Sequence, residues 1–281
     1  MNIEIDYNDL KELGRTGEKI PAIGLGTWGI GGSFSPDYSR DDYWVKIIRK
    51  AIELGMWLID TAEMYARGHA EELVGRAIKA FDREEVFIIT KVWPDNYSYE
   101  KLIKAAKASL ERLDTKYIDL YLLHWPTSNM PLRELMKAME HLVDQGIIRY
   151  IGVSNFDVNL VEEARSYLSR EDIVANEVKY SLRDRGIERD LLPYAQKERI
   201  TIIAYTPLEK GALARDRNLA KIGEKYGKTA AQVALNWLIS KHYVVAIPKA
   251  GIEEHLRENA EAMGWRLRPE DIMYIEKLYP I

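Results

Sequence analysis

Short apolar runs rich in Val, Ile and Leu alternate with longer amphipathic stretches along the chain, one pair about every 25–35 residues. The runs predict eight strands, at Ala22–Leu25, Trp57–Ile59, Val86–Thr90, Ile118–Leu123, Tyr150–Val153, Ile173–Val178, Thr201–Tyr205 and Val244–Ile247. Strands that are apolar nearly throughout are typical of a parallel sheet covered by helices. Eight strand and helix pairs therefore predict a (β/α)8 TIM barrel.

Two helix starts carry the spacing of a capping box, because Ser39 stands three residues before Asp42 and Thr229 three before Gln232. The chain from Pro269 onward predicts an extra C-terminal helix with proline in its first turn. No linker interrupts the pattern, so a single domain over residues 1–281 is expected.

The segments before the first strand predict a short N-terminal hairpin, formed by Asp9–Leu13 and Glu18–Ile20 around Gly14-Arg-Thr-Gly17. An open doubly wound sheet is the alternative α/β fold, and it carries a glycine-rich dinucleotide turn after its first strand. The nearest segment, Gly24-Leu-Gly-Thr-Trp-Gly29, continues into Gly31 and Gly32. We interpret it as a strand end followed by a loop, which favours the barrel.

The amino-acid composition excludes several classes of protein and of function. Of 281 residues, 47% are hydrophobic and 30% are charged, which excludes a disordered chain. The net charge of −4 gives no basic excess for nucleic acid or an anionic membrane, so a small-molecule partner is expected. Because the chain has no cysteine, disulfides and a thiol nucleophile are excluded, and any redox chemistry requires a bound cofactor.

Several features bear on location and stability. The segment Met1–Leu10 has acids where a signal peptide would be basic and then apolar, and no apolar run has the length of a membrane span. A cytoplasmic location is therefore expected. A monomer is the expected state of a single barrel with no spare apolar helix face. The many charged residues and the lack of cysteine favour a thermostable protein. The five histidines show no metal-ligand spacing, so no metal is expected.

Active sites of such barrels lie at the carboxyl ends of the strands, so polar residues that end each run are candidates. They are Asp60, Lys91, His124, Ser154, Asn155, Asn176, Glu177, Tyr205 and Lys249, with Tyr65 in the loop after Asp60. Taken singly, each also has a structural interpretation, such as a helix cap or a hydrogen-bonded core residue. Together, a carboxylate, an ammonium, an imidazole and a phenol predict proton transfer, with Lys91 lowering the pKa of Tyr65.

Motifs spread over nearly the whole chain carry a resemblance to one family. They are Gly24-Leu-Gly-Thr-Trp28, Ile59-Asp-Thr-Ala-Glu-Met-Tyr65, Gly75, Thr90-Lys91, Leu122-Leu-His-Trp-Pro126, Gly152-Val-Ser-Asn-Phe156, Ala204-Tyr-Thr-Pro-Leu208, Ile247-Pro-Lys249 and Glu258-Asn259. In this order they resemble the aldo-keto reductase family, most of all the alcohol dehydrogenase D type of hyperthermophilic archaea. The resemblance implies a barrel enzyme that binds a nicotinamide dinucleotide, reversibly reduces ketones and aldehydes, and oxidises secondary alcohols.

The resemblance also assigns roles to individual residues. The implied catalytic residues are Asp60, Tyr65, Lys91 and His124. Tyr65 would donate the proton in carbonyl reduction and accept it in alcohol oxidation, and His124 would polarise the carbonyl. The implied nicotinamide contacts are Ser154 and Asn155 to the carboxamide and Tyr205 stacked on the ring. Glu177 stands where the family often has glutamine, and an ionised glutamate accepts a hydrogen bond but donates none.

Other residues match the rest of the dinucleotide site. They are Leu208 and Gly211 beside the pyrophosphate, Lys249 beside the adenosine phosphate, and Glu258 and Asn259 beside the adenine. Ala250 and His255 stand where the NADP pattern has serine and arginine, so a hydroxyl and a guanidinium fork for the 2′-phosphate are missing. NAD(H) is therefore the expected cofactor, with NADP(H) as the alternative.

The implied substrate pocket is apolar. It is formed by residues that follow strand ends: Trp28, Met64, Trp93 and Trp125. The segment from Pro126 to Met130 is short, which favours an open pocket and a broad range of small carbonyl compounds and secondary alcohols.

Three other functions remain open from the sequence. An NADPH-preferring carbonyl reductase would share the site but not the cofactor choice. A barrel aldolase would use Lys91 as a Schiff-base nucleophile. A regulatory subunit would bind the nicotinamide cofactor with little turnover.

Overall fold

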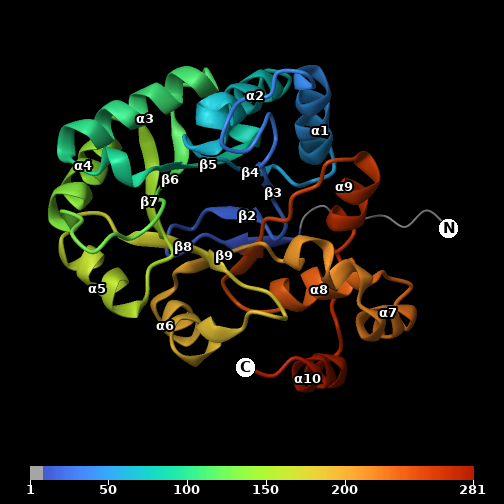
Figure 1. The fold of residues 1–281 in the computed structure, drawn as a ribbon. Coiled ribbons are helices and arrows are strands. Elements are labelled where there is room, and N and C mark those ends of the chain that lie inside the picture. The colour runs from blue at the N-terminus through green and yellow to red at the C-terminus, as the bar shows by residue number, and fades with distance from the viewer. Residues whose placement is uncertain (1–8) are drawn as a thin grey trace.

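The computed structural model of the protein describes residues 9–281, so the prediction about Met1–Leu10 lies almost entirely outside the described residues. The first described elements form the predicted hairpin. Strands β1 (Leu10–Glu12) and β2 (Lys19–Pro21) pair antiparallel, with Lys11 opposite Ile20. In Figure 1 the hairpin lies across the end of the barrel that is farther from the viewer.

Eight parallel strands form the barrel (Figure 1). They are β3 (Leu25–Gly26), β4 (Leu58–Asp60), β5 (Phe87–Val92), β6 (Ile118–Leu123), β7 (Ile148–Ser154), β8 (Ile173–Lys179), β9 (Thr201–Tyr205) and β10 (Val244–Ala246). Each strand pairs with the next in sequence. Hydrogen bonds from Gly24 N to Ala246 O (2.8 Å) and from Ala246 N to Ala22 O (3.0 Å) join the two ends of the sheet. The predicted (β/α)8 fold is confirmed.

Helices surround the sheet and bury its outer face. They are α1 (Asp41–Glu53), α2 (His69–Ile78), α3 (Tyr99–Leu113), α4 (Leu132–Asp144), α5 (Val158–Ser166), α6 (Leu191–Glu198), α7 (Arg217–Glu224), α8 (Ala230–Ile239), α9 (Glu253–Ala260) and α10 (Pro269–Leu278). The last of these is the predicted C-terminal helix, which has Pro269 in its first turn. Within residues 9–281, no helix combines the length and the apolar character that crossing a bilayer requires.

Two apolar layers result from the alternation of side chains along each strand. One layer fills the barrel and includes Leu58, Ile89, Leu122 and Ile203. The other lies between the strands and the helices. Residues two positions beyond an interior residue again point into the barrel, one layer nearer to its carboxyl end. This alternation decides which polar residues reach the site.

The two predicted capping boxes have different outcomes. At α8 the prediction is confirmed, because Thr229 N donates to Gln232 Oε1 (3.0 Å) and Gln232 N donates to Thr229 Oγ1 (3.3 Å). At α1 it is wrong. The helix begins after Arg40, and Ser39 Oγ instead donates to Asp37 Oδ1 (2.6 Å) in the preceding loop. Arg40 occupies the N-cap position, so Ser39 lies one residue too early for its hydroxyl to accept from the helix amides.

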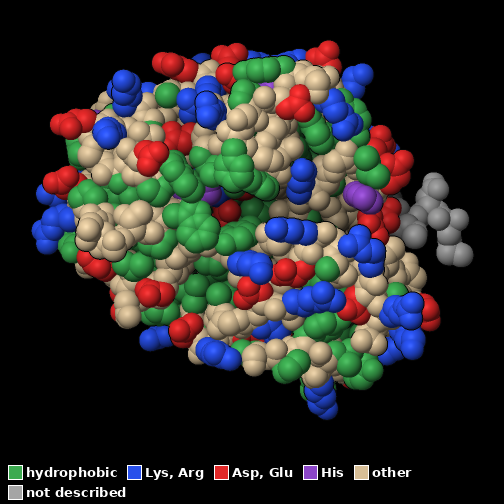
Figure 2. All heavy atoms as spheres, in the orientation of Figure 1, with side chains coloured by type: hydrophobic (Ala, Val, Ile, Leu, Met, Phe, Trp, Pro, Cys, Tyr) green, Lys and Arg blue, Asp and Glu red, His purple; other side chains and the backbone are tan. Residues whose placement is uncertain are grey.

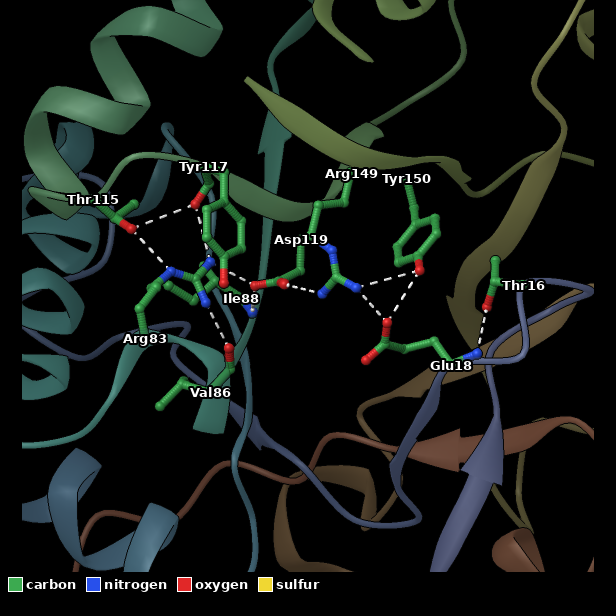
Figure 3. A network of polar contacts seen from close by, with 10 residues as sticks. All are labelled: Thr16, Glu18, Arg83, Val86, Ile88, Thr115, Tyr117, Asp119, Arg149 and Tyr150. Carbon is green, nitrogen blue, oxygen red and sulfur yellow. Dashed lines mark hydrogen bonds and ion pairs between the residues drawn. The ribbon is translucent and has the colours of Figure 1, made fainter. Parts of the chain in front are cut away.

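A buried polar network connects the strands at the hairpin end of the barrel (Figure 3). The carboxylate of Asp119 accepts hydrogen bonds from Arg83 Nη2 (2.5 Å), Arg149 Nη1 (2.8 Å) and the Ile88 amide (2.8 Å). Arg149 also contacts Glu18, the residue before β2. The network therefore ties the hairpin to the barrel, at the end opposite to the predicted site.

Candidate active site

A cavity of about 1040 Å³ opens at the carboxyl end of the strands. In Figure 2 the hollow lies near the centre of the face, bordered by hydrophobic side chains and, on another side, by Lys and Arg side chains. Every predicted site residue lines it except Lys91, which is fully buried beneath it. Asn176, a further strand-end candidate, does not line it and instead donates to Phe156 O (2.8 Å).

The alternation of the strands explains this convergence. Asp60, Lys91 and His124 each follow an interior residue, Leu58, Ile89 or Leu122, by two positions. They therefore form the next layer inside the barrel, above its apolar filling. Glu177 follows the interior residue Ala175, and Tyr205 follows Ile203, in the same way.

Lys91 is the centre of a buried cluster of charges. Its ammonium donates to Asp60 Oδ1 (2.5 Å), to Thr61 O (3.0 Å) and to the phenol oxygen of Tyr65 (3.4 Å). Burial opposes the charge of Lys91, but the adjacent acidic residues, above all the carboxylate of Asp60, raise its pKa. Lys91 is therefore a cation that orients its neighbours, and its three N–H bonds all have acceptors.

Tyr65 reaches the cavity from an irregular turn, Tyr65–Gly68, that follows β4. Ala66 (φ 49°) and Arg67 (φ 56°) both have left-handed backbone, which costs free energy in residues with a β-carbon. The Ala66 amide donates to Ser33 O (2.7 Å), which ties the turn to the loop after β3. The fold holds the phenol in place at this cost.

The expected effect of Lys91 on Tyr65 is only partly correct. Burial raises the pKa of Tyr65 above its ordinary value, and the charge of Lys91 lowers it, but the charge of Asp60 raises it again. The net direction is upward, so Tyr65 is a phenol at neutral pH. The sequence could not predict this because it depends on how completely the turn is buried.

His124 lies beside Tyr65, with ring centroids 5.7 Å apart, and beside Trp93 at 5.1 Å. Burial, followed by the charge of Lys91, lowers the pKa of His124 to about 2. Its imidazole is therefore neutral. Its Nδ1 has no hydrogen-bond partner among the described residues. A neutral imidazole at this position has one N–H to donate to a ligand oxygen.

Beside the main chain of His124, Ser154, Asn155 and Tyr205 are linked to one another by hydrogen bonds. Asn155, in left-handed backbone (φ 63°), donates through Nδ2 to His124 O (3.2 Å) and to Ser154 Oγ (3.0 Å). The hydroxyl of Tyr205 donates to Asn155 Oδ1 (2.9 Å). This network fixes a set of amide, hydroxyl and aromatic groups that suits a flat, amide-bearing ring.

Glu177 lies at the floor of the cavity, where its side chain is 4% exposed. Its Oε2 lies 3.3 Å from Lys91 Nζ but has no hydrogen-bond donor among the described residues. Burial, and then the charge of Asp60, raise the pKa of Glu177 well above the ordinary range.

The far side of the cavity suits phosphate groups. Lys249 Nζ lies so near Gly29 that a β-carbon there would be 2.9 Å from it, so the glycine leaves the space for the ammonium. Lys210 and Arg215, which the sequence analysis missed, line the same cavity. Their position in a loop around Gly211 was the available signal. This donor set and the wall formed by Asn155 fit the two ends of a dinucleotide.

Aromatic side chains form the outer rim. Trp28 is 39% exposed and Trp125 is 42% exposed, although both line the cavity. Trp28 contacts Tyr65 and also Phe34, with ring centroids at 5.0 Å and 5.2 Å. Phe34 is a further lining residue that the sequence analysis missed. The rim therefore offers apolar surface next to the phenol.

Comparison with known proteins agrees with this architecture. The chain is 52% identical to a thermostable aldo-keto reductase, Tm1743, solved with the inhibitor epalrestat, with a TM-score of 0.92 over 96% of this chain and 99% of that chain. It is 39% identical to an aldo-keto reductase from Klebsiella pneumoniae solved with NADPH, with a TM-score of 0.89 over 96% and 95% of the two chains.

Among curated proteins, the chain is 41% identical to the methylglyoxal reductase YeaE of Escherichia coli, over 93% of this chain and 92% of that protein. The sequence model described as the aldo/keto reductase family matches residues 22–280. The match spans the barrel and every residue of the cavity described above. The chain therefore belongs to the aldo/keto reductase family and is an oxidoreductase.

Proposed function

We propose that this enzyme interconverts small carbonyl compounds and alcohols, and that Tyr65 exchanges the proton with the substrate oxygen. One observation carries the proposal. The phenol oxygen of Tyr65 accepts a hydrogen bond from Lys91, which has only donors to offer (3.4 Å). The proton of Tyr65 is therefore free to point into the cavity, toward a substrate oxygen.

The other residues prepare this transfer. A bound nicotinamide cofactor supplies or takes up the hydride at the substrate carbon. His124, held neutral, donates an N–H to the carbonyl oxygen and stabilises the charge that develops there. Asp60 keeps Lys91 charged and in place, and Lys91 in turn stabilises the phenolate form of Tyr65. Ser154, Asn155 and Tyr205 would hold the nicotinamide, and Leu208, Gly211, Lys249, Glu258 and Asn259 the rest of the dinucleotide.

The same contacts argue against the two other classes of function. A Schiff-base enzyme needs a neutral lysine amine, whereas Lys91 is paired with Asp60 and its pKa is raised. A regulatory subunit without turnover would not require the strained turn that places Tyr65 beside Lys91. Trapping of a carbonyl substrate on Lys91 by borohydride would revive the first of these.

The cofactor preference is a separate part of the proposal. His255 is exposed but has no guanidinium fork, and Ala250 is buried and has no hydroxyl. Neither residue can therefore make the contacts to a 2′-phosphate that arginine and serine would make. We infer that NAD(H) is preferred. NADPH in the Klebsiella pneumoniae structure supports the alternative, an NADPH-preferring reductase, and titrating both cofactors by quenching of tryptophan fluorescence decides between them.

For the substrate, the aromatic rim and the short segment after Trp125 favour small ketones, aldehydes and secondary alcohols. The name of the Escherichia coli relative adds methylglyoxal to the panel. Action on secondary alcohols, as in the archaeal alcohol dehydrogenase D type, is part of the same proposal, as are a single domain, a monomeric state and a cytoplasmic location. Oxidation or formation of the reduced nicotinamide, followed by absorbance over a panel of carbonyls and alcohols, tests it. No turnover with any member would contradict it.

A further inference from the structure

The floor of the cavity holds one more acid than the proposed mechanism uses. Asp60 from β4 and Glu177 from β8 both contact Lys91 from β5, at 2.5 Å and 3.3 Å. With both acids ionised, two negative charges would face one positive charge, on side chains that are each at most 4% exposed. Burial makes such an excess charge costly, and the usual remedy is a bound proton.

The hydrogen bonds show which acid holds that proton. All three N–H bonds of Lys91 have other acceptors, so Glu177 Oε2 receives no directed donor and is left without a partner among the described residues. Asp60 Oδ1, in contrast, lies 2.5 Å from the ammonium and accepts one of its N–H bonds. Where two buried acids share one cation, the acid with the directed hydrogen bond keeps its negative charge, and the acid without a donor is the one that binds a proton. Asp60 has the direct contact with the lysine, which leaves the proton on Glu177.

Glu177 lies next to the residues proposed to hold the nicotinamide, so the charge of the bound ring should affect whether Glu177 keeps its proton. The main-chain oxygen of Glu177 accepts hydrogen bonds from Ser154 Oγ (2.9 Å) and from the Asn155 amide (2.9 Å). Glu177 is therefore bonded to the two residues proposed to hold the carboxamide. An oxidised nicotinamide ring carries a positive charge, and a reduced ring carries none. A positive charge at this wall favours the ionised form of Glu177.

We propose that Glu177 carries a proton in the cofactor-free enzyme and releases it when the oxidised nicotinamide cofactor binds. It thereby makes the enzyme select oxidised over reduced cofactor as the pH rises. The inference rests on the proposed use of a nicotinamide dinucleotide. The other titratable groups that face Glu177 are Asp60, Lys91, Tyr65 and, from β9, Tyr205. Of these, Tyr65 is the competing source of a released proton.

Proton release is measured directly by titration calorimetry with NAD+ and with NADH, in buffers of different ionisation enthalpy near pH 8. The wild type should release up to one proton with NAD+ and none with NADH. Glu177→Gln keeps the shape of the side chain but removes its proton, so its release with NAD+ should fall to near zero. NADH affinity within about threefold of the wild type would show that the variant's site is intact.

The pH dependence gives a second measurement. The affinity of the wild type for NAD+ should rise with pH by up to about tenfold per unit between the pKa values of Glu177 in the bound and free enzyme. In Glu177→Gln this dependence should disappear. Tyr65→Phe is the matched control, and it should still release the proton.

The outcomes separate the two proposals. Unchanged release in Glu177→Gln, loss of release in Tyr65→Phe, or no release in the wild type overturns the role of Glu177 while leaving the proposed function intact. If neither NAD+ nor NADH binds, the titration is repeated with NADP+ and NADPH. Failure of all four to bind refutes the proposed function itself, and this inference with it. Infrared difference spectra of the wild type, in which NAD+ should remove a protonated-carboxyl band, need no variant at all.

Discussion

The ammonium of Lys91 lies 2.5 Å from the carboxylate of Asp60, in a layer of the barrel where both side chains are shielded from water. Because the two residues come from neighbouring strands, β4 and β5, the pair is set by the register of the sheet. The same ammonium contacts Tyr65, so the protonation of the phenol is tied to both charges. Two of the predictions below follow from this arrangement.

Removing the phenol hydroxyl tests the proposed proton donor. Tyr65→Phe should lower the rate of carbonyl reduction at least about 100-fold, because positioned acid–base groups contribute roughly 10²–10⁴-fold. Cofactor affinity, measured by quenching of tryptophan fluorescence, should change little. A variant that keeps more than about a tenth of the wild-type rate would exclude Tyr65 as the proton donor.

The pH dependence follows from the raised pKa of Tyr65. Reduction needs the phenol and oxidation needs the phenolate, so oxidation should have the more alkaline optimum. Lys91→Met removes a charge that lowers this pKa, so the pH range over which the oxidation rate rises should move upward. Asp60→Asn removes a charge that raises the pKa, and the same range should move downward. Shifts of about one pH unit are expected for each, and shifts in the same direction would contradict the assignment.

The cofactor preference is tested by restoring the missing guanidinium. His255→Arg should add a charge-assisted contact worth roughly 1.5–3 kcal/mol, or about 10- to 150-fold in NADP affinity. NAD affinity should barely change, which serves as the internal control. If the wild type binds NADP more than tenfold tighter than NAD, or if the substitution leaves the ratio unmoved, then the 2′-phosphate site lies elsewhere.

The space beside Lys249 gives a test of the phosphate end. At Gly29 (φ +81°) an added methyl group would lie 2.9 Å from Lys249 Nζ and displace it. Because this ammonium is the far end of a flexible side chain and can shift, Gly29→Ala should weaken dinucleotide binding by roughly threefold to tenfold. Gly17→Ala is a matched control, because Gly17 has a similar φ of +78° with nothing near its β-carbon. Equal cofactor affinities in the two variants would remove Lys249 from the site.

The network at the hairpin end should contribute to stability rather than to activity. Asp119→Ala leaves Arg83 and Arg149 without their buried carboxylate, and should cost about 3–5 kcal/mol in the free energy of unfolding. Glu253→Ala breaks an exposed pair with Arg257 and should cost less than about 1 kcal/mol. Denaturant unfolding measures both. Equal losses of unfolding free energy in the two variants would mean that the buried ion pairs of Asp119 stabilise the fold no more than an exposed pair does.

The barrel and its polar strand ends were predictable from the order of residues along the chain. Apolar runs and amphipathic helices are local patterns, and the alternation along each strand already places Asp60, Lys91 and His124 on one side. Local hydrogen bonding was less predictable. The box at Thr229 formed, whereas Ser39 found Asp37 instead, because competing partners in a loop are decided by its path.

The charges at the site and the extent of the cavity could be established only from the folded structure. The pKa of Tyr65 rises because burial outweighs the charge of Lys91, and the sequence does not state how deeply a loop is buried. In the sequence, Glu177 was only a departure from the glutamine often found in the family. In the structure, its carboxyl group lies 3.3 Å from the ammonium of Lys91. Lys210 and Arg215 line the cavity because the loop that follows β9 folds over it. Desolvation and charge proximity depend on three-dimensional distances, which residues far apart in sequence acquire only on folding.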